Sequence, residues 1–101
     1  MPNKATVKLL PKARGDLTEI FRYIGEELKN PVAALALTDK FYDAFERLED
    51  FPLGCPVCKT ETEYRKLVVD NYIAFYKYDE TKKAVIIFRI LYGMMNYDKY
   101  I

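Results

Sequence analysis

The sequence has 101 residues, of which 50% are hydrophobic and 15% aromatic, and this predicts one folded domain over residues 1–101. Sixteen basic residues stand against fifteen acidic ones. The chain therefore lacks the basic excess that non-specific nucleic-acid binding needs. We also expect no direct sequence-specific DNA binding by this chain alone. Histidine is absent, which removes the commonest general base near neutral pH and the usual metal ligand.

Targeting and membrane segments are not indicated. The N-terminus has no hydrophobic run of the kind that a signal peptide needs, and the longest purely apolar stretch, AVIIF, is far shorter than a membrane span. We expect a cytoplasmic protein without membrane association.

The first half of the chain predicts a strand followed by two helices. Val7 and Leu9 mark a short strand that Pro11 stops. Apolar residues then recur at helical spacing on both sides of Asn30-Pro31, and proline suits a first helical turn, so we expect an antiparallel helical hairpin. The expected buried positions are Leu17, Ile20, Phe21, Ile24 and Leu28 in the first helix and Ala34, Leu37, Phe41, Ala44, Phe45 and Leu48 in the second, which ends before Phe51-Pro52.

The second half predicts a β-meander. After a loop over residues 53–61 the hydrophobic period changes from helical to alternating. YRKLVV, YIAFYKY and AVIIFRILY are the expected strands, separated by the two-residue turn Asp70-Asn71 and by DETKK. The fold class is α+β, with the N-terminal strand joining an antiparallel sheet and the helical hairpin covering one face.

Pairing about the Asp70-Asn71 turn assigns side chains to the two faces, because paired residues share a face. The face expected under the helices holds Leu67, Val69, Tyr72, Ala74 and Tyr76, joined by Phe88 and Ile90. The face expected to stay open holds Tyr64, Lys66, Val68, Ile73, Phe75 and Lys77, joined by Ile87, Arg89 and Leu91. An apolar centre bordered by cations favours a groove for an apolar partner segment that also attracts anions. The alternative is a solvated face with lysine stems lying over apolar neighbours.

The motifs A-x-x-DL-x-x-I-x-x-YI (from Ala13), L-x-x-FP (from Leu48), YRKLVVDNYIAFY (from Tyr64) and FRILYG (from Phe88) occur in this order. Together they resemble the RelE/ParE superfamily of bacterial type II toxins over nearly the whole chain. The resemblance implies a helical hairpin on a curved antiparallel sheet and a growth-arresting toxin neutralised by an antitoxin. It also implies one of two targets. RelE-like members cut messenger RNA in the ribosome with residues of the open face, and ParE-like members poison DNA gyrase.

The nuclease pattern is mostly missing from this chain. Lys66 stands where RNA-cutting relatives often have a strand lysine, but Ile73 and Met95 stand at or beside positions where they have arginine. Cleavage by 2′-OH attack needs a base, an acid and cations, and the loss of one electrostatic contact commonly costs about 10²–10³ in rate. The sequence therefore favours a ParE-like toxin that binds a protein target, with gyrase as the candidate, over an enzyme.

Two alternatives stay open. One is a ribosome-dependent mRNA endoribonuclease with the atypical site Lys66, Lys77, Arg89 and Tyr97. The other is a degenerate member that only binds its antitoxin. The expected surface for antitoxin and target comprises Tyr64, Lys66, Val68, Ile73, Phe75, Lys77, Arg89, Tyr92, Met94 and Met95. Methionine and tyrosine suit such contacts, because one is adaptable and the other amphipathic.

Cys55-Pro-Val-Cys58 has the spacing of zinc knuckles and redox pairs. The chain offers no further cysteine or histidine ligand, and the motif lies in a loop rather than at the start of a helix. We expect two reduced thiols, with a labile disulfide and a metal site shared across a dimer as alternatives. No cofactor or metal is predicted.

Overall fold

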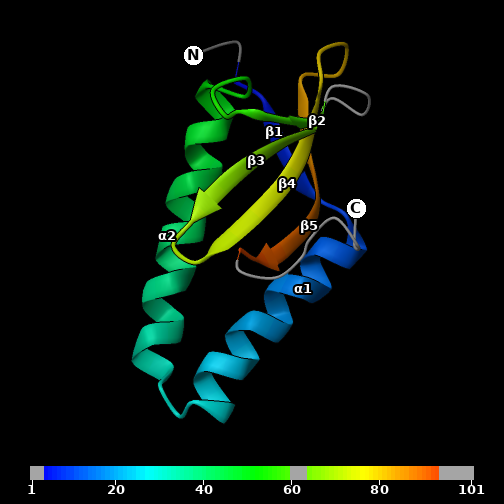
Figure 1. Ribbon diagram of the computed structural model, residues 1–101. Helices are drawn as coiled ribbons and strands as arrows, with labels where there is room; N and C mark the ends of the chain where they lie inside the picture. Colours follow the sequence, from blue (N-terminus) through cyan, green and yellow to red (C-terminus); the bar gives the residue numbers. More distant parts are fainter. Residues whose placement is uncertain (1–3, 60–63, 94–101) are drawn as a thin grey trace.

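The fold is known from a computed structural model that describes residues 4–59 and 64–93. Two helices pack on one side of a five-stranded sheet with the strand order β1-β5-β4-β3-β2 (Figure 1). β1 runs parallel to β5, and the other neighbouring strands are antiparallel. The predicted α+β architecture is confirmed. The elements are β1 (Thr6–Leu9), α1 (Pro11–Arg22), η1 (Tyr23–Glu27), α2 (Pro31–Asp50), β2 (Val57–Lys59), β3 (Tyr64–Val69), β4 (Tyr72–Asp79) and β5 (Ala84–Tyr92).

Both α-helices begin at a proline, where the missing N–H costs nothing. The side chain of Asn30 caps α2 by accepting a hydrogen bond from the backbone N–H of Ala33 at 3.1 Å. α2 ends at Asp50, before Phe51-Pro52, as predicted. Its apolar stripe also forms as expected, with Leu37, Phe41, Ala44 and Leu48 buried.

The first helix differs from its prediction at the C-terminal end. Its last turn, η1, is a π-helix, in which Leu28 donates its N–H to the carbonyl of Tyr23 at 3.0 Å. The wider turn shifts the helical phase, so Leu28 leaves the apolar stripe and is 56% exposed. Its expected burial was wrong. Figure 1 shows that this tip of the hairpin extends beyond the sheet.

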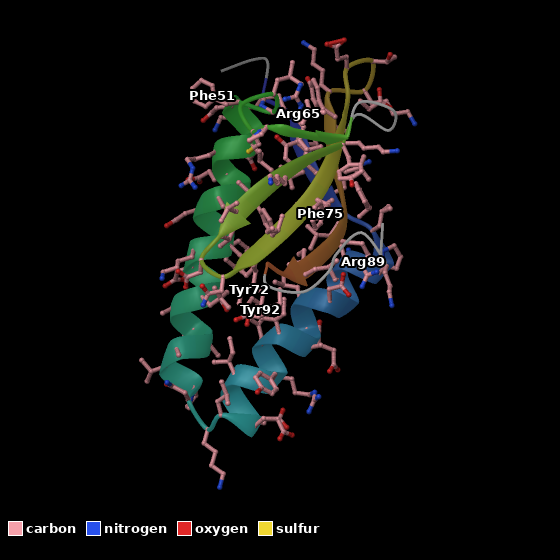
Figure 2. The ribbon with its side chains drawn as sticks, viewed as in Figure 1. Phe51, Arg65, Tyr72, Phe75, Arg89 and Tyr92 are labelled. Atoms are coloured by element: carbon pink, nitrogen blue, oxygen red, sulfur yellow. The ribbon has the colours of Figure 1, made fainter. Side chains whose placement is uncertain are left out.

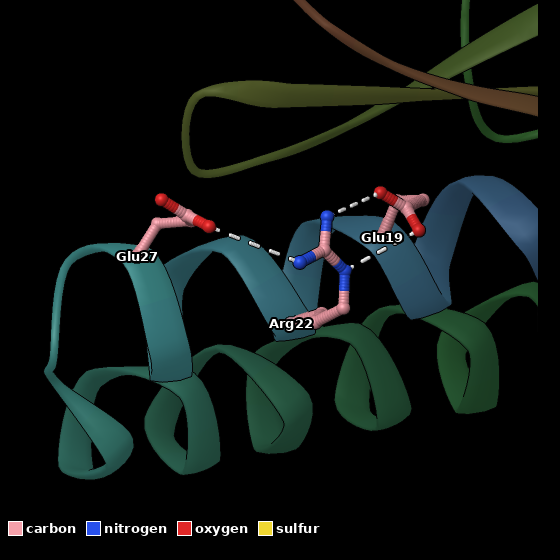
Figure 3. Close-up of polar contacts among 3 residues, drawn as sticks. All are labelled: Glu19, Arg22 and Glu27. Carbon is pink, nitrogen blue, oxygen red and sulfur yellow. Dashed lines mark hydrogen bonds and ion pairs between the residues drawn. The ribbon is translucent and has the colours of Figure 1, made fainter.

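Arg22 links α1 to η1 on the solvent side (Figure 3). Its guanidinium donates to the Glu19 carboxylate at 2.9 Å and lies 4.0 Å from that of Glu27. The hydrogen bond and the charge of Arg22 lower the pKa of Glu19 below 4.5. All three side chains are exposed, so these pairs contribute little to stability.

The predicted register of β3 and β4 is confirmed, with Val68 opposite Ile73 and Val69 opposite Tyr72. The expected residues of the two strands therefore pack under the helices. The sheet contributes seven buried side chains to that core: Leu67, Val69, Ala74, Tyr76, Val85, Ile87 and Ile90.

β5 corrects two of the predicted orientations. Phe75 lies opposite Arg89, but Tyr76 lies opposite Ile87, so Phe88 is an extra residue in a β-bulge. Because of this extra residue, the β5 residues before the bulge point to the face opposite to the one that strict alternation from Arg89 would give them. Ile87 therefore packs under the helices, and Phe88 lies on the other face. Both had been assigned the opposite way.

β2 is a strand that the sequence did not predict. Val57 lies opposite Arg65 at the edge of the sheet. The preceding loop is held by two side chains of neighbouring strands. Arg65 donates to the carbonyl of Cys55 at 2.6 Å, and the buried Tyr76 donates its hydroxyl to the carbonyl of Pro52 at 2.8 Å.

Candidate functional site

The candidate site is the open sheet face, which is the face of the sheet turned away from α1 and α2. Its centre is a cluster of Tyr64, Ile73, Phe75 and Leu91, with Phe88 packed against it. The rings of Phe75 and Phe88 meet that of Tyr64 edge to face, with centroids 5.8 and 5.6 Å away. The predicted grouping of Tyr64, Ile73 and Phe75 on one face is therefore correct.

The apolar centre is nevertheless buried. Phe75 has no exposed surface and Tyr64 is 1% exposed. The sequence had suggested an apolar centre accessible to a partner. In the fold these side chains form a second, smaller hydrophobic core. A partner segment would therefore contact the exposed side chains around this core and not the core itself.

The open sheet face is accessible at Val68 and at a hollow beside β1. Val68 on β3 is 60% exposed. Between β1, β5 and β4 lies a hollow of about 510 Å³, lined by Leu10, Lys77, Ile86 and Phe88 among others. Sequence reasoning missed Ile86 as a site residue, because the bulge obscures the alternation of β5. It also missed Leu10, which lies between β1 and α1, outside the strands whose faces were assigned.

Two predicted cations lie at these regions. Lys77 is exposed, and its Nζ atom lies 6.0 Å from the centre of the Phe88 ring, a cation–π distance. Lys66 is partly exposed and lies opposite Phe75. The accessible surface therefore combines apolar side chains with lysines.

Arg89 has a different environment, because it binds a carboxylate of its own chain. Its Nε atom donates to Oδ2 of Asp16 at 2.7 Å, and Nη2 donates to Oδ1 at 3.1 Å. Oδ2 also accepts the backbone N–H of Ile90 at 3.0 Å. The side chains of Arg89 and Asp16 are 15% and 12% exposed. Figure 2 shows Arg89 beside α1.

The local fold explains this contact. β1 pairs with β5 only as far as Ile87, and the chain then turns into α1 at Pro11. Beyond that point the edge of β5 faces α1 instead of a strand. Asp16 supplies the acceptor that Ile90 would otherwise take from a neighbouring strand. The charge of Arg89 is compensated there, in a bidentate pair.

Tyr92 lies apart from the other predicted site residues. It pairs with Tyr72, which faces the helices, and their ring centroids are 5.8 Å apart (Figure 2). Burial raises the pKa of Tyr72, with smaller contributions from Tyr92, Tyr23 and Asp70. The Tyr72 phenol is therefore neutral at physiological pH.

Some predicted features cannot be placed. Met94, Met95 and Tyr97 lie outside the described residues, as does the side chain of Cys58. Residues 4–59 and 64–93 contain no group of three or more histidine, cysteine or acidic side chains that could hold a metal ion. No helix in the same two ranges has the length and hydrophobicity to cross a lipid bilayer.

Comparisons with known proteins agree with the fold. The chain is similar to the chromosomal ParDE toxin-antitoxin system of P. aeruginosa, with 20% identity, a TM-score of 0.72 and coverage of 89% of this chain and 97% of that one. It is also similar to the toxin-antitoxin complex RelBE2 of Mycobacterium tuberculosis, with 25% identity, a TM-score of 0.62 and coverage of 88% and 98%. Among curated protein sequences there is no match.

A family model described as the ParE toxin of the type II toxin-antitoxin system parDE matches residues 7–97. The match spans every described helix and all but the first residue of the described strands. The chain therefore belongs to the ParE toxin family and is the toxin of a type II toxin-antitoxin system.

Proposed function

We propose that this toxin arrests growth by binding a protein target, with DNA gyrase as the candidate, and that it does not cut RNA. The Asp16–Arg89 pair carries the proposal. An RNA-cutting site needs cations aimed at the phosphate on which charge develops. The guanidinium of Arg89 instead donates twice to a carboxylate in a largely buried site. Turning it toward a phosphate would leave Asp16 buried without its cation, which is costly.

The rest of the open sheet face supports the same choice. Lys8, Lys66 and Lys77 are described cations of its accessible part, and no histidine exists in the sequence to move a proton. Ile73, whose position is basic in the RNA-cutting relatives that the sequence resembles, belongs to the buried cluster. The alternative nuclease site of Lys66, Lys77, Arg89 and Tyr97 would thus have its arginine bound to Asp16.

We propose further that a cognate antitoxin neutralises the toxin by covering the open sheet face. The two solved structures compared above are both of toxin-antitoxin systems, which supports such a partner. Exposed Val68 and the hollow beside Lys77 favour a partner segment with apolar and acidic side chains. Binding there would hide the surface from the target.

The test compares the two target classes with one preparation of toxin freed from its antitoxin. We expect inhibition of gyrase supercoiling and no ribosome-dependent cleavage of messenger RNA. Robust cleavage that is lost in Lys66→Ala would overturn the proposal in favour of a nuclease. Expression without antitoxin that leaves growth unaffected would instead identify a degenerate member.

A further inference from the structure

Strand β1 leaves one edge of the sheet open. It is the terminal strand in the order of the sheet, and within residues 4–59 and 64–93 no strand pairs with its outer side. The N–H groups of Thr6 and Leu10 donate to carbonyls at the β5 edge, each at 2.9 Å. Backbone groups alternate along a strand, so the N–H and C=O of Val7 and Leu9 point outward. This edge can therefore pair with another strand.

A groove runs along the same edge, between β1 and α2. It has a volume of about 350 Å³, and Val7, Leu9 and Phe45 form its apolar floor. The carboxylates of Asp43, Glu46 and Glu49 line it from α2. A hydrogen bond of 2.8 Å from the N–H of Ala5 to the carbonyl of Glu49 closes one end.

The negative charge of the groove indicates which kind of partner segment can bind there. Glu49 has Lys4 4.0 Å away, but Asp43 and Glu46 have no ion pair among the described residues. A nucleic acid would be repelled, and an acidic peptide likewise. Lys or Arg side chains fit, because their aliphatic stems can lie over the apolar floor while their charged ends reach the carboxylates.

The open edge sets the conformation and spacing of the occupant. An added strand would bond to Val7 and Leu9 and would turn every second side chain toward α2. We propose that the β1 edge accepts an extended segment of a partner protein with Lys or Arg at every second residue, which joins the sheet as a further strand. This site is distinct from the open sheet face, and it does not depend on the identity of the toxin's target.

The test uses a blocked pentapeptide of sequence Thr-Arg-Thr-Arg-Thr with the toxin, followed by amide hydrogen exchange in NMR spectra. At saturating peptide we expect the exchange of the Val7 and Leu9 amides to slow about tenfold or more, because they gain acceptors. The amide of Lys8, which points toward β5, should change little. Unchanged exchange at Val7 and Leu9 in the presence of bound peptide would overturn the proposal.

Controls separate strand addition from simple charge attraction. Glu46→Lys should weaken peptide binding about tenfold, whereas Asp39→Lys, an exposed change on α2 that does not line the groove, should leave it nearly unchanged. A peptide with the order Arg-Arg-Thr-Thr-Thr has the same charge but lacks the alternation. Equal affinity for both peptides, or an equal loss in both variants, would also overturn the proposal. Neither result bears on gyrase or ribosome assays, so the two proposals fail independently.

Discussion

The carboxylate of Asp16 binds the guanidinium of Arg89 across 73 residues of sequence, and one of its oxygens also accepts the N–H of Ile90. The contact connects α1 to the C-terminal part of β5, which has no pairing with β1. We expect Asp16→Ala to lower the free energy of unfolding by about 3 kcal/mol, because it removes the carboxylate from a largely buried cation. Urea denaturation measures this change.

A second ion pair provides the control. Lys40 and Asp70 lie 3.0 Å apart, but their side chains are 56% and 48% exposed. Lys40→Ala should cost less than about 1 kcal/mol. If both variants lose the same stability, the Asp16–Arg89 pair does not anchor α1.

Tyr76 offers a test of the loop before β2. Its ring is fully buried, and its hydroxyl donates to the Pro52 carbonyl at 2.8 Å. Burial and the contact with Cys55 raise its pKa, so the phenol stays neutral and able to donate. Tyr76→Phe should therefore destabilise the fold by about 1 kcal/mol, because the carbonyl loses its donor.

The matched variant is Tyr78→Phe, since the described residues form no hydrogen bond with the Tyr78 hydroxyl. Its unfolding free energy should stay within about 0.5 kcal/mol of the native value. Thermal or urea unfolding of the two variants side by side decides the question. A smaller loss in Tyr76→Phe than in Tyr78→Phe would show that the hydroxyl does not hold the loop.

Glu19 gives a prediction about pH. The hydrogen bond and charge of Arg22 lower its pKa below 4.5, so the carboxylate is favoured in the folded state. The Glu19–Arg22 contact therefore stabilises the folded state at pH values above the pKa that Glu19 has in the unfolded chain. This stabilisation is lost as the pH falls through the lower pKa that Glu19 has in the folded state. Arg22→Gln should return the Glu19 pKa toward 4.5 in an NMR titration, whereas Lys12→Gln should not. An unchanged Glu19 titration in Arg22→Gln would contradict the pairing in Figure 3.

The sequence predicted the helices and the β3–β4 hairpin because short-range rules govern them. A two-residue turn fixes which side chains of β3 and β4 share a face, and Val69 does pair with Tyr72. The helical hairpin follows from Asn30-Pro31 and two apolar stripes. The π-helical turn before Leu28 could not be predicted from the sequence, because its residues are of the same types as those at the end of an ordinary α-helix.

The candidate site was harder to predict, because it depends on long-range contacts. AVIIFRIL is apolar at nearly every position, so alternation alone could not locate the bulge at Phe88. Alternation placed Arg89 on the open sheet face, but its partner is Asp16, which reaches it only because β1 ends where α1 begins. The burial of Phe75 likewise follows from rings on three strands meeting in space.

Val68 is the sharpest probe of the proposed antitoxin surface. A charge at Phe75 would place an unpaired carboxylate in the buried cluster and cost several kcal/mol of folding stability, so its effect on binding could not be separated. Val68 shares that face but is 60% exposed, so Val68→Asp should fold normally. We expect it to weaken the complex with a cognate antitoxin about tenfold or more, because an apolar contact is replaced by a desolvated charge.

Val32→Asp is the control for Val68→Asp, since Val32 is 75% exposed but lies on α2, on the helical side of the molecule. Both variants add the same charge to an exposed valine, so net charge cannot explain a difference between them. Dissociation constants from calorimetry should change for Val68→Asp alone. A loss confined to Val32→Asp would move the antitoxin to the helical side and leave the open sheet face free for the target in the neutralised complex.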